Sequence, residues 1–331
     1  MIKYPPIKIN LGLNVLRKRE DGFHDLETLF LESGRFHDTL EIVTGDDYSR
    51  TMASLAARYG DRCGISDGDI PALAQGISEN GKLMITVARA EGVDWDVRKD
   101  LCAKAYALLD NDFKLPPAKI FLEKNSPVGA GLGGGSADAA YTLTMLNDIC
   151  SLGLSTEQLA GYAARLGSDC AFFIFGRPMF GEGRGEVLTP FELAVDIVDA
   201  GGAACSGSRT GSSDGGNDSS GTGTARPCTR EHPEKGRPQY ELQTVIPEGI
   251  SVSTAEAYRG ITPAIPEMRL KDVLTRPVSE WKDLLVNDFE ATVFKAHPEL
   301  AAIKQSLYDS GAIYASMSGS GSALFALYER R

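Results

Sequence analysis

The sequence predicts an α+β protein with two domains. At 331 residues the chain is long enough for two domains that each bury a core of their own. Segments with strand-like alternation and segments with helical spacing of apolar residues follow one another in mixed order. Apolar residues make up 42% of the chain and charged residues 24%, which is ordinary for a globular protein. An enzyme with a cleft between two domains is therefore the starting expectation.

Strands are predicted where apolar residues alternate with other residue types. Residues 7–15 alternate in this way, which puts Lys8 and Asn10 on one face of the first strand. Residues 39–43 repeat the pattern, and residues 120–122 form a short apolar strand that leads to a glycine-rich stretch. A final apolar strand follows a second glycine-serine segment near the C-terminus.

Helices are predicted for residues 98–109 and 136–150, because their apolar residues recur at helical spacing. A further helix begins at Ser155, which forms a capping-box pattern with Gln158. Gly167 is placed to end that helix.

Two insertions interrupt this pattern. Gly, Ser and Thr fill 17 of the 24 positions from 201 to 224, so this stretch has too little apolar area to offset the entropy of ordering. We expect a disordered loop from about residue 200 to 239. A second loop elaboration is expected around residues 45–80, where glycines and aspartates interrupt weak periodicity. Neither insertion is an expected site of chemistry.

Bulk charge and composition argue against several classes of protein. The net charge of −11 repels nucleic-acid phosphates, so nucleic-acid binding is not expected. No apolar run approaches the roughly 20 residues of a membrane helix, and the N-terminus has no secretory signal pattern. The six cysteines are scattered without zinc-ligand spacing. We expect a cytoplasmic protein with reduced thiols and no membrane partner.

The strongest chemical signal is the stretch from Pro127 to Asp138, which has five glycines between 129 and 135 and leads straight into a helix. Glycines allow close backbone approach, and the amides at a helix N-terminus attract anions. We call residues 127–135 the glycine cradle and predict that they bind phosphate. The cradle lacks the Gly-Lys-[Ser/Thr] ending of a P-loop. Its match to the dinucleotide fingerprint is weak, because a second helix follows instead of a second parallel strand.

Together with Pro-x-x-Lys8-x-Asn10 and the segment 316–322, the cradle resembles the three motifs of the GHMP kinase superfamily. The resemblance covers nearly the whole chain, in the right order. It is closest to the family of 4-diphosphocytidyl-2-C-methyl-D-erythritol kinases, through segments 22–30, 167–169 and 253–258. It implies a ribosomal protein S5 domain 2-like N-terminal lobe at residues 1–190, followed by a ferredoxin-like C-terminal lobe at residues 191–331.

The resemblance also implies a function and a set of site residues. ATP and Mg²⁺ would be the cofactors, and the substrate would be cytidine diphosphate methylerythritol, phosphorylated on its 2-hydroxyl in the non-mevalonate isoprenoid pathway. Lys8 and Asp169 would be the catalytic pair, and Ser136 would contact the metal. The expected nucleotide-binding residues are Pro127, Gly129, Gly131, Leu132, Gly133, Gly134, Gly135, Ser136 and Ala137. The expected substrate-binding residues are Asn10, Phe23, His24, Asp169 and Tyr258, with the rings of Phe23 and Tyr258 enclosing the pyrimidine and His24 reading its edge.

Some alternatives stay open at this stage. Ser136 could instead serve as a plain N-cap. Ser168 and Ala171 depart from the Ala and Pro that commonly flank the family's catalytic aspartate, and Ala130 replaces a usual glycine. The chain could also be a homoserine or mevalonate type of GHMP kinase, or a catalytically silent metabolite sensor on the same fold. It could be a monomer or a homodimer.

Overall fold

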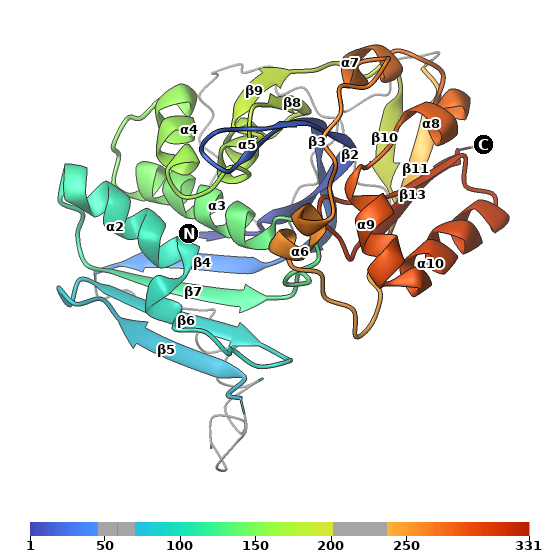
Figure 1. The fold of residues 1–331 in the computed structure, drawn as a ribbon. Helices are drawn as coiled ribbons and strands as arrows, with labels where there is room; N and C mark the ends of the chain where they lie inside the picture. Colours follow the sequence, from blue (N-terminus) through green and yellow to red (C-terminus); the bar gives the residue numbers. More distant parts are fainter. Residues whose placement is uncertain (46–57, 59–69, 201–236, 331) are drawn as a thin grey trace. The chain divides into compact units, whose positions relative to one another are not determined.

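The computed structural model describes residues 1–45, 58, 70–200 and 237–330 (Figure 1). The chain divides into two compact units that interleave along the sequence. The first consists of Met1–Lys8, Phe36–Phe175 and Arg184–Glu186, and the second consists of Ile9–Arg35, Gly176–Gly183 and Val187–Arg331. The predicted division near residue 190 stays a prediction.

The first unit is a five-stranded sheet covered by helices. Its strand order is β1 (Ile2–Lys3), β4 (Thr39–Thr44), β7 (Ala118–Lys124), β6 (Leu83–Arg89) and β5 (Leu73–Ile77). Only β6 and β7 are parallel neighbours, and the connection between them contains the 3₁₀ helix η2 (Val97–Lys99) and α2 (Leu101–Phe113). The other helices in the described part of this unit are α3 (Gly134–Ile149), α4 (Thr156–Ala164) and α5 (Cys170–Phe175). Helices α2 and α3 lie across one face of the sheet (Figure 1).

The second unit contains two four-stranded sheets. One has the order β2 (Pro6–Lys18), β3 (His24–His37), β8 (Met179–Glu182) and β9 (Val187–Pro190). The other has the order β10 (Asp196–Asp199), β11 (Gln239–Val245), β13 (Leu324–Glu329) and β12 (Tyr314–Met317). Because β3 pairs with β2 on one side and with β8 on the other, the N-terminal residues 9–35 belong to the same unit as the C-terminal half.

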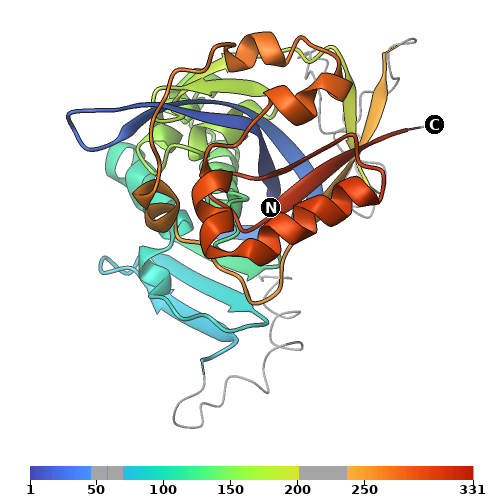
Figure 2. The same ribbon diagram turned by 45° about the vertical axis from the view of Figure 1, so that its right-hand side comes forward.

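The described residues of the second unit also form the helices α6 (Thr254–Arg259), α7 (Leu270–Val273), α8 (Val278–Leu284), α9 (Phe289–Ala296) and α10 (Pro298–Asp309). Leu13 and Val15 of β2 share one hydrophobic core with side chains of α9, α10, β12 and β13. Figure 2 shows α9 and α10, in red and orange, lying against the strands of this unit.

The predicted strands at 7–15, 39–43 and 120–122 are confirmed as β2, β4 and β7, and the final strand is β13. The predicted helices are confirmed as α2, α3 and α4, with the capping box of Ser155 and Gln158 in place. Helix α4 ends at Ala164, so it stops before Gly167, the predicted end.

The loop prediction for residues 45–80 is wrong for β5. Its residues form backbone hydrogen bonds with β6 at the edge of the sheet, where weak periodicity is enough for a strand. The rest of that prediction, at 46–57 and 59–69, lies outside the described residues, as does most of the predicted disordered loop, at 201–236.

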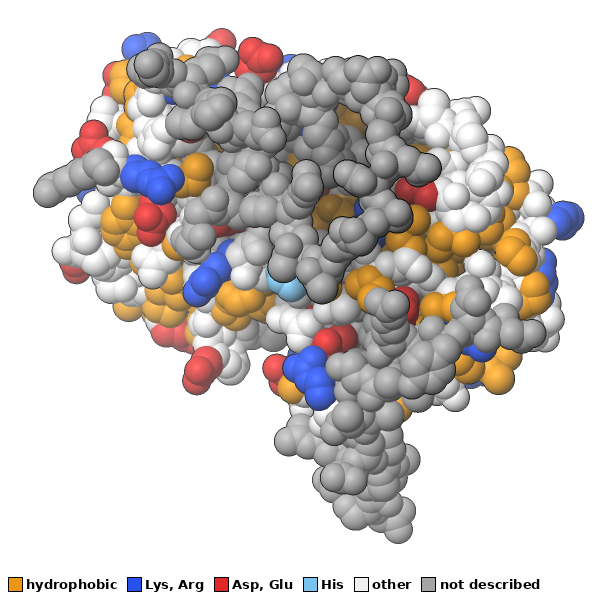
Figure 3. Space-filling view, turned by 180° about the vertical axis from the view of Figure 1, so that it is seen from behind, with side chains coloured by type: hydrophobic (Ala, Val, Ile, Leu, Met, Phe, Trp, Pro, Cys, Tyr) orange, Lys and Arg blue, Asp and Glu red, His pale blue; other side chains and the backbone are white. Residues whose placement is uncertain are grey.

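On the face drawn in Figure 3, the basic and acidic side chains that can be seen are interspersed. Among the described residues, no helix is both long and apolar enough to cross a bilayer.

Candidate functional site

The glycine cradle forms a tight turn that opens onto the N-terminus of α3. Gly131 and Gly133 have φ angles of 76° and 70°, a left-handed conformation that strains any residue with a Cβ atom. Gly133 is the N-cap residue of α3, and Gly134 is its first helical residue. The first amides of a helix have no intrahelical acceptor, so the cradle presents donors suited to a phosphate.

The cradle lines a pocket of about 400 Å³ within the first unit. Its lining also includes Trp95 just before η2, Lys99 of η2, and Asp100 and Leu101 at the start of α2. An aromatic ring and an aliphatic side chain near a phosphate-binding loop suit the base of a nucleotide. Sequence reasoning missed Trp95, because the segment before α2 carries no recognisable motif.

Lys8 and Asp169 lie together beside the cradle. Lys8 Nζ is 3.3 Å from Asp169 Oδ2, with side chains that are 5% and 29% exposed, respectively. The backbone N–H of Lys8 donates a 2.8 Å hydrogen bond to the carbonyl of Leu132, which ties β2 to the cradle. The structure thus brings together the two residues that the sequence predicts as a pair, although they are 161 positions apart in the chain.

Ser136 lies in the first turn of α3 and lines the same pocket. The alternative reading of Ser136 as the N-cap is wrong, because Gly133 occupies that position. Burial raises the pKa of the Cys170 thiol to about 11, and a hydrogen bond with Ser136 opposes this shift. Since Cys170 follows Asp169 directly, this contact brings the α3 hydroxyl close to the segment that carries Asp169.

A buried charge cluster underlies the cradle, and the sequence did not reveal it. Lys124 at the end of β7 pairs with Asp38, and its Nζ lies 2.6 Å from Asp138 Oδ2. Asp38 also accepts hydrogen bonds from the backbone N–H groups of Asn125 and Ser126, at 2.7 Å each. The cluster therefore connects the β3–β4 corner, the segment entering the cradle and the second turn of α3.

The charges of this cluster depend on one another. Burial alone would lower the pKa of Lys124, but the carboxylates of Asp138 and Asp38 outweigh it and hold the pKa above its usual value. Burial raises the pKa of Asp138 well above its usual value, despite the attraction of Lys124, and the nearby Asp38 adds to this shift. Two carboxylates thus share one ammonium group in a largely buried site.

The predicted substrate residue Asn10 is buried in the second unit. Its side-chain N–H donates to Thr28 Oγ1 at 3.1 Å, and the Thr28 hydroxyl in turn donates to the carbonyl of Gly12 at 2.6 Å. Its backbone N–H donates to Ser318 Oγ at 3.3 Å. Asn10 is therefore held between β3 and the glycine-serine segment near the C-terminus.

His24 and Tyr258 also lie together in the second unit. Their rings stack at a centroid distance of 4.7 Å and an angle of 21°. Burial, followed by the charge of Lys18, lowers the pKa of His24. Phe23 is 54% exposed. The ring facing Tyr258 is thus that of His24, and the enclosing role assigned to Phe23 stays a prediction.

Comparison with known proteins accords with this geometry. Residues 100–177 match the family described as GHMP kinases N terminal domain, and residues 270–331 match GHMP kinases C terminal. A 4-diphosphocytidyl-2-C-methyl-D-erythritol kinase of Bacteroides fragilis is 38% identical over 99% of this chain and 92% of its own length. The protein of that name from Parabacteroides distasonis is 37% identical, over 100% of this chain and 92% of its own length.

The chain belongs to the 4-diphosphocytidyl-2-C-methyl-D-erythritol kinase family. A crystal structure of 4-(cytidine 5'-diphospho)-2C-methyl-D-erythritol kinase is similar with a TM-score of 0.62 and 26% identity, over 99% of this chain and 90% of that one. A mevalonate kinase structure, at 10% identity and a TM-score of 0.55, shares the fold. The predicted GHMP kinase fold is confirmed.

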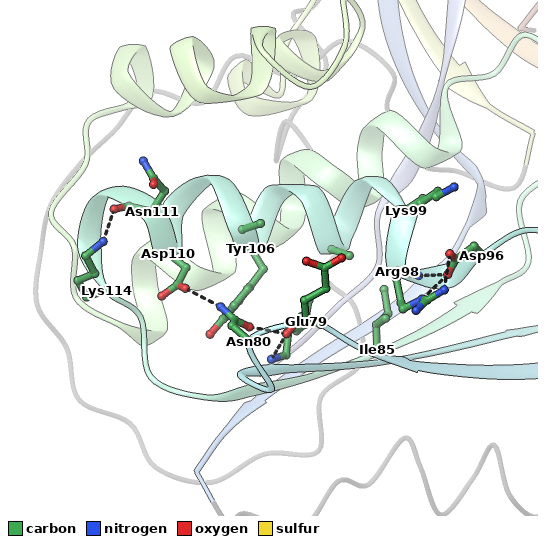
Figure 4. Close-up of a pocket in the computed structure, with 14 residues that line it drawn as sticks. Glu79, Asn80, Ile85, Asp96, Arg98, Lys99, Tyr106, Asp110, Asn111 and Lys114 are labelled. Carbon is green, nitrogen blue, oxygen red and sulfur yellow. Dashed lines mark hydrogen bonds and ion pairs between the residues drawn. The ribbon is translucent and has the colours of Figure 1, made fainter.

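A second pocket in the first unit, of about 620 Å³, lies between α2 and the β5–β6 hairpin (Figure 4). Within it, Arg98 pairs with Asp96, and Lys114 donates to the carbonyl of Asn111. None of the site residues expected for this kinase family lines it, and its charged groups are of both signs. The pocket beside the cradle is therefore the better candidate site.

Proposed function

We propose that this protein transfers the γ-phosphoryl group of ATP to the 2-hydroxyl of 4-diphosphocytidyl-2-C-methyl-D-erythritol. Full-length relatives that carry the name of this kinase support the substrate. The observation that carries the chemistry is the ion pair of Lys8 and Asp169, which is attached to the cradle through the hydrogen bond from Lys8 to Leu132. A phosphate-binding loop beside a carboxylate and an ammonium group supplies the parts that phosphoryl transfer needs.

In this proposal the cradle amides hold the ATP phosphates, and Asp169 accepts the proton of the attacking hydroxyl. Its partial exposure leaves the carboxylate accessible to a substrate. The nearly buried ammonium of Lys8 orients Asp169 and stabilises negative charge that develops on the transferred group. Lys8 acts from β2, and Asp169 acts from the turn immediately before α5.

The residues around the pocket fit a magnesium ion. Mg²⁺ prefers oxygen ligands and commonly keeps several waters, with few protein ligands besides the phosphates. The Ser136 hydroxyl and the carboxylate of Asp100 both line the pocket and would supply such oxygens. When bound, the ion would neutralise charge on the phosphates.

We assign recognition of the cytidine to the stacked rings of His24 and Tyr258, with Phe23 as a further aromatic contact. Stacking faces and an edge with hydrogen-bonding nitrogens are what a pyrimidine ring requires. Asn10, fixed by Thr28, would contact the hydroxyl groups of the methylerythritol moiety.

The test is an ADP-release assay on the wild type, Asp169→Asn and the control Asp148→Asn, which changes an exposed carboxylate near the end of α3. We expect Asp169→Asn to lower kcat about 10²- to 10⁴-fold, as the loss of a general base does, while Asp148→Asn has no effect. Equal rates for the wild type and Asp169→Asn would remove Asp169 from the mechanism. Turnover with homoserine or mevalonate but not the cytidyl substrate would refute the specificity, and no turnover at all would favour a silent sensor.

A further inference from the structure

Asn287 occupies an unusual position in the second unit. It lies between α8 and α9, is 3% exposed, and pairs with Leu13 of β2 in an isolated parallel bridge. The flanking backbone continues this attachment: Leu13 N–H donates to the Val286 carbonyl at 2.9 Å, and Asp288 N–H donates to the Leu13 carbonyl at 2.9 Å. Residues 286–288 therefore run beside the strand that carries Asn10.

The side chain of Asn287 reaches from this segment to the glycine-serine loop of residues 317–321. Its Nδ2 group donates to the carbonyls of Met317 and Gly319, at 2.7 and 2.9 Å, and its Oδ1 accepts from the N–H of Phe289 at 3.0 Å. Both donor hydrogens and the acceptor of this amide are thus engaged. Because the site is buried, water cannot replace these bonds if the amide is lost.

Holding these two carbonyls determines what the rest of the loop can contact. In a trans peptide unit the C=O and N–H bonds point in opposite directions. With the Gly319 carbonyl directed at Asn287, the N–H of Ser320 points away from it, and no hydrogen bond joins that N–H to the described part of the chain. The N–H is left available as a donor to an oxygen atom of a ligand.

The loop also touches two of the elements that carry candidate substrate residues, β2 and α6. Ser318 Oγ accepts from the N–H of Asn10 at 3.3 Å, and Ser320 Oγ lies 3.4 Å from Thr254 Oγ1 at the start of α6, the helix that contains Tyr258. A shift of the loop would therefore move or release contacts on both sides of the candidate substrate site.

We propose that Asn287 is a positioning residue for the acceptor substrate. It holds the 317–321 loop so that Ser318 supports Asn10 and the Ser320 N–H faces the ligand. This inference rests on the proposed function. In this proposal, Asn287 itself does not touch a reacting atom.

The test uses Asn287→Asp, which places a carboxylate against two carbonyl oxygens, and the milder Asn287→Ala. The control is Asn147→Asp, since Asn147 also holds a loop in place through its side-chain amide, by bonds to the N–H and carbonyl of Leu154 in the first unit. We expect both Asn287 variants to lower kcat/KM for the acceptor about 100-fold, as a displaced positioning group does. The KM for ATP should stay within about twofold, because the hydrogen bonds of the Asn287 side chain go to Met317, Gly319 and Phe289 and not to the cradle.

A second readout needs no activity. The Ser318 N–H donates to the Ala323 carbonyl at 2.9 Å, and its hydrogen exchange should accelerate at least about tenfold in both Asn287 variants but not in the control. Acceptor kinetics and exchange that match those of Asn147→Asp would overturn the proposal. So would failure of both variants to fold, because Asn287 would then serve folding rather than the site. A wild type that uses a different alcohol would refute the substrate assignment alone, and the same variants would then be compared with that alcohol.

Discussion

The buried charge cluster beneath the cradle allows a sharp test through Lys124→Met. Methionine is close to lysine in length and keeps most of its apolar stem, so the change removes the ammonium while leaving little cavity. The side chains of Asp38 and Asp138, which are 1% and 2% exposed, then lose the cation that they share. The substitution therefore isolates the electrostatic contribution of Lys124.

The expected cost follows from the contacts that remain. Asp38 keeps the N–H groups of Asn125 and Ser126 and the Ser126 hydroxyl, which donates at 2.8 Å. Asp138 keeps nothing equivalent: its Oδ2 loses the bond to Lys124, and its Oδ1 is buried without a hydrogen bond to any described residue. Removing one partner of a buried pair costs about 3–5 kcal/mol, which is a large part of the roughly 5–15 kcal/mol that stabilises a typical protein.

Chemical denaturation of the variant gives the free energy of unfolding directly. The matched control is Lys82→Met, because Lys82 pairs with Asp110 in the same unit but is 30% exposed, and we expect a loss of at most about 1 kcal/mol there. Adding Asp138→Asn to Lys124→Met should recover part of the stability, because the asparagine amide has no charge that would be left buried without a partner. A Lys124→Met protein within about 1 kcal/mol of the wild type, or a double variant no more stable than the single one, would refute this account.

Two further predictions concern the sites themselves. Gly134→Ala would place a Cβ atom 2.4 Å from Ser126 Oγ, so we expect the KM for ATP to rise about tenfold or more. The control is Gly161→Ala, which has open space around its Cβ atom; it should leave the KM for ATP unchanged and stabilise α4 by up to about 1 kcal/mol. A Gly134→Ala protein with normal ATP kinetics would contradict the close packing of the cradle. Since burial lowers the pKa of His24 below its ordinary 6.5, the neutral imidazole is retained until the pH falls below that value. The KM for the cytidyl substrate should therefore rise on acidification below pH 6.5 in the wild type but not in His24→Gln, and identical pH profiles would exclude His24 from cytosine recognition.

Those parts of the fold that depend on local patterns could be predicted from the sequence. The alternation of Ile7, Ile9 and Leu11 indicates β2, and Ser155 with Gln158 indicates the start of α4, because both signals come from residues near one another in the chain. Strand β5 was missed because its hydrogen bonds to β6, rather than its own residues, make it a strand. The pairing of Lys8 with Asp169 was predictable only through the motifs in which they lie.

The buried polar residues were beyond sequence reasoning for a related reason. Lys124 follows a glutamate at the end of a strand, and Asp38 precedes a strand, so each resembles an ordinary surface residue. They are buried because folding brings together two residues that are 86 positions apart in the chain. Of these three residues, Asp138 alone has a neighbourhood that indicates burial: it directly precedes Ala139 and Ala140 in a helix whose buried face includes all three.

The two glycine-rich loops explain why such buried partners are needed. Each loop has a single large buried side chain, Leu132 or Met317, so packing fixes only part of its conformation, and glycine loses more conformational entropy on ordering than other residues do. Each loop is instead held from outside: the cradle by Lys8 through Leu132 and by the Asp38 cluster at its entry, and the 317–321 loop by the amide of Asn287. The glycines that would contact a ligand can therefore be recognised in the sequence, whereas the residues that hold them can be found only once the chain has folded.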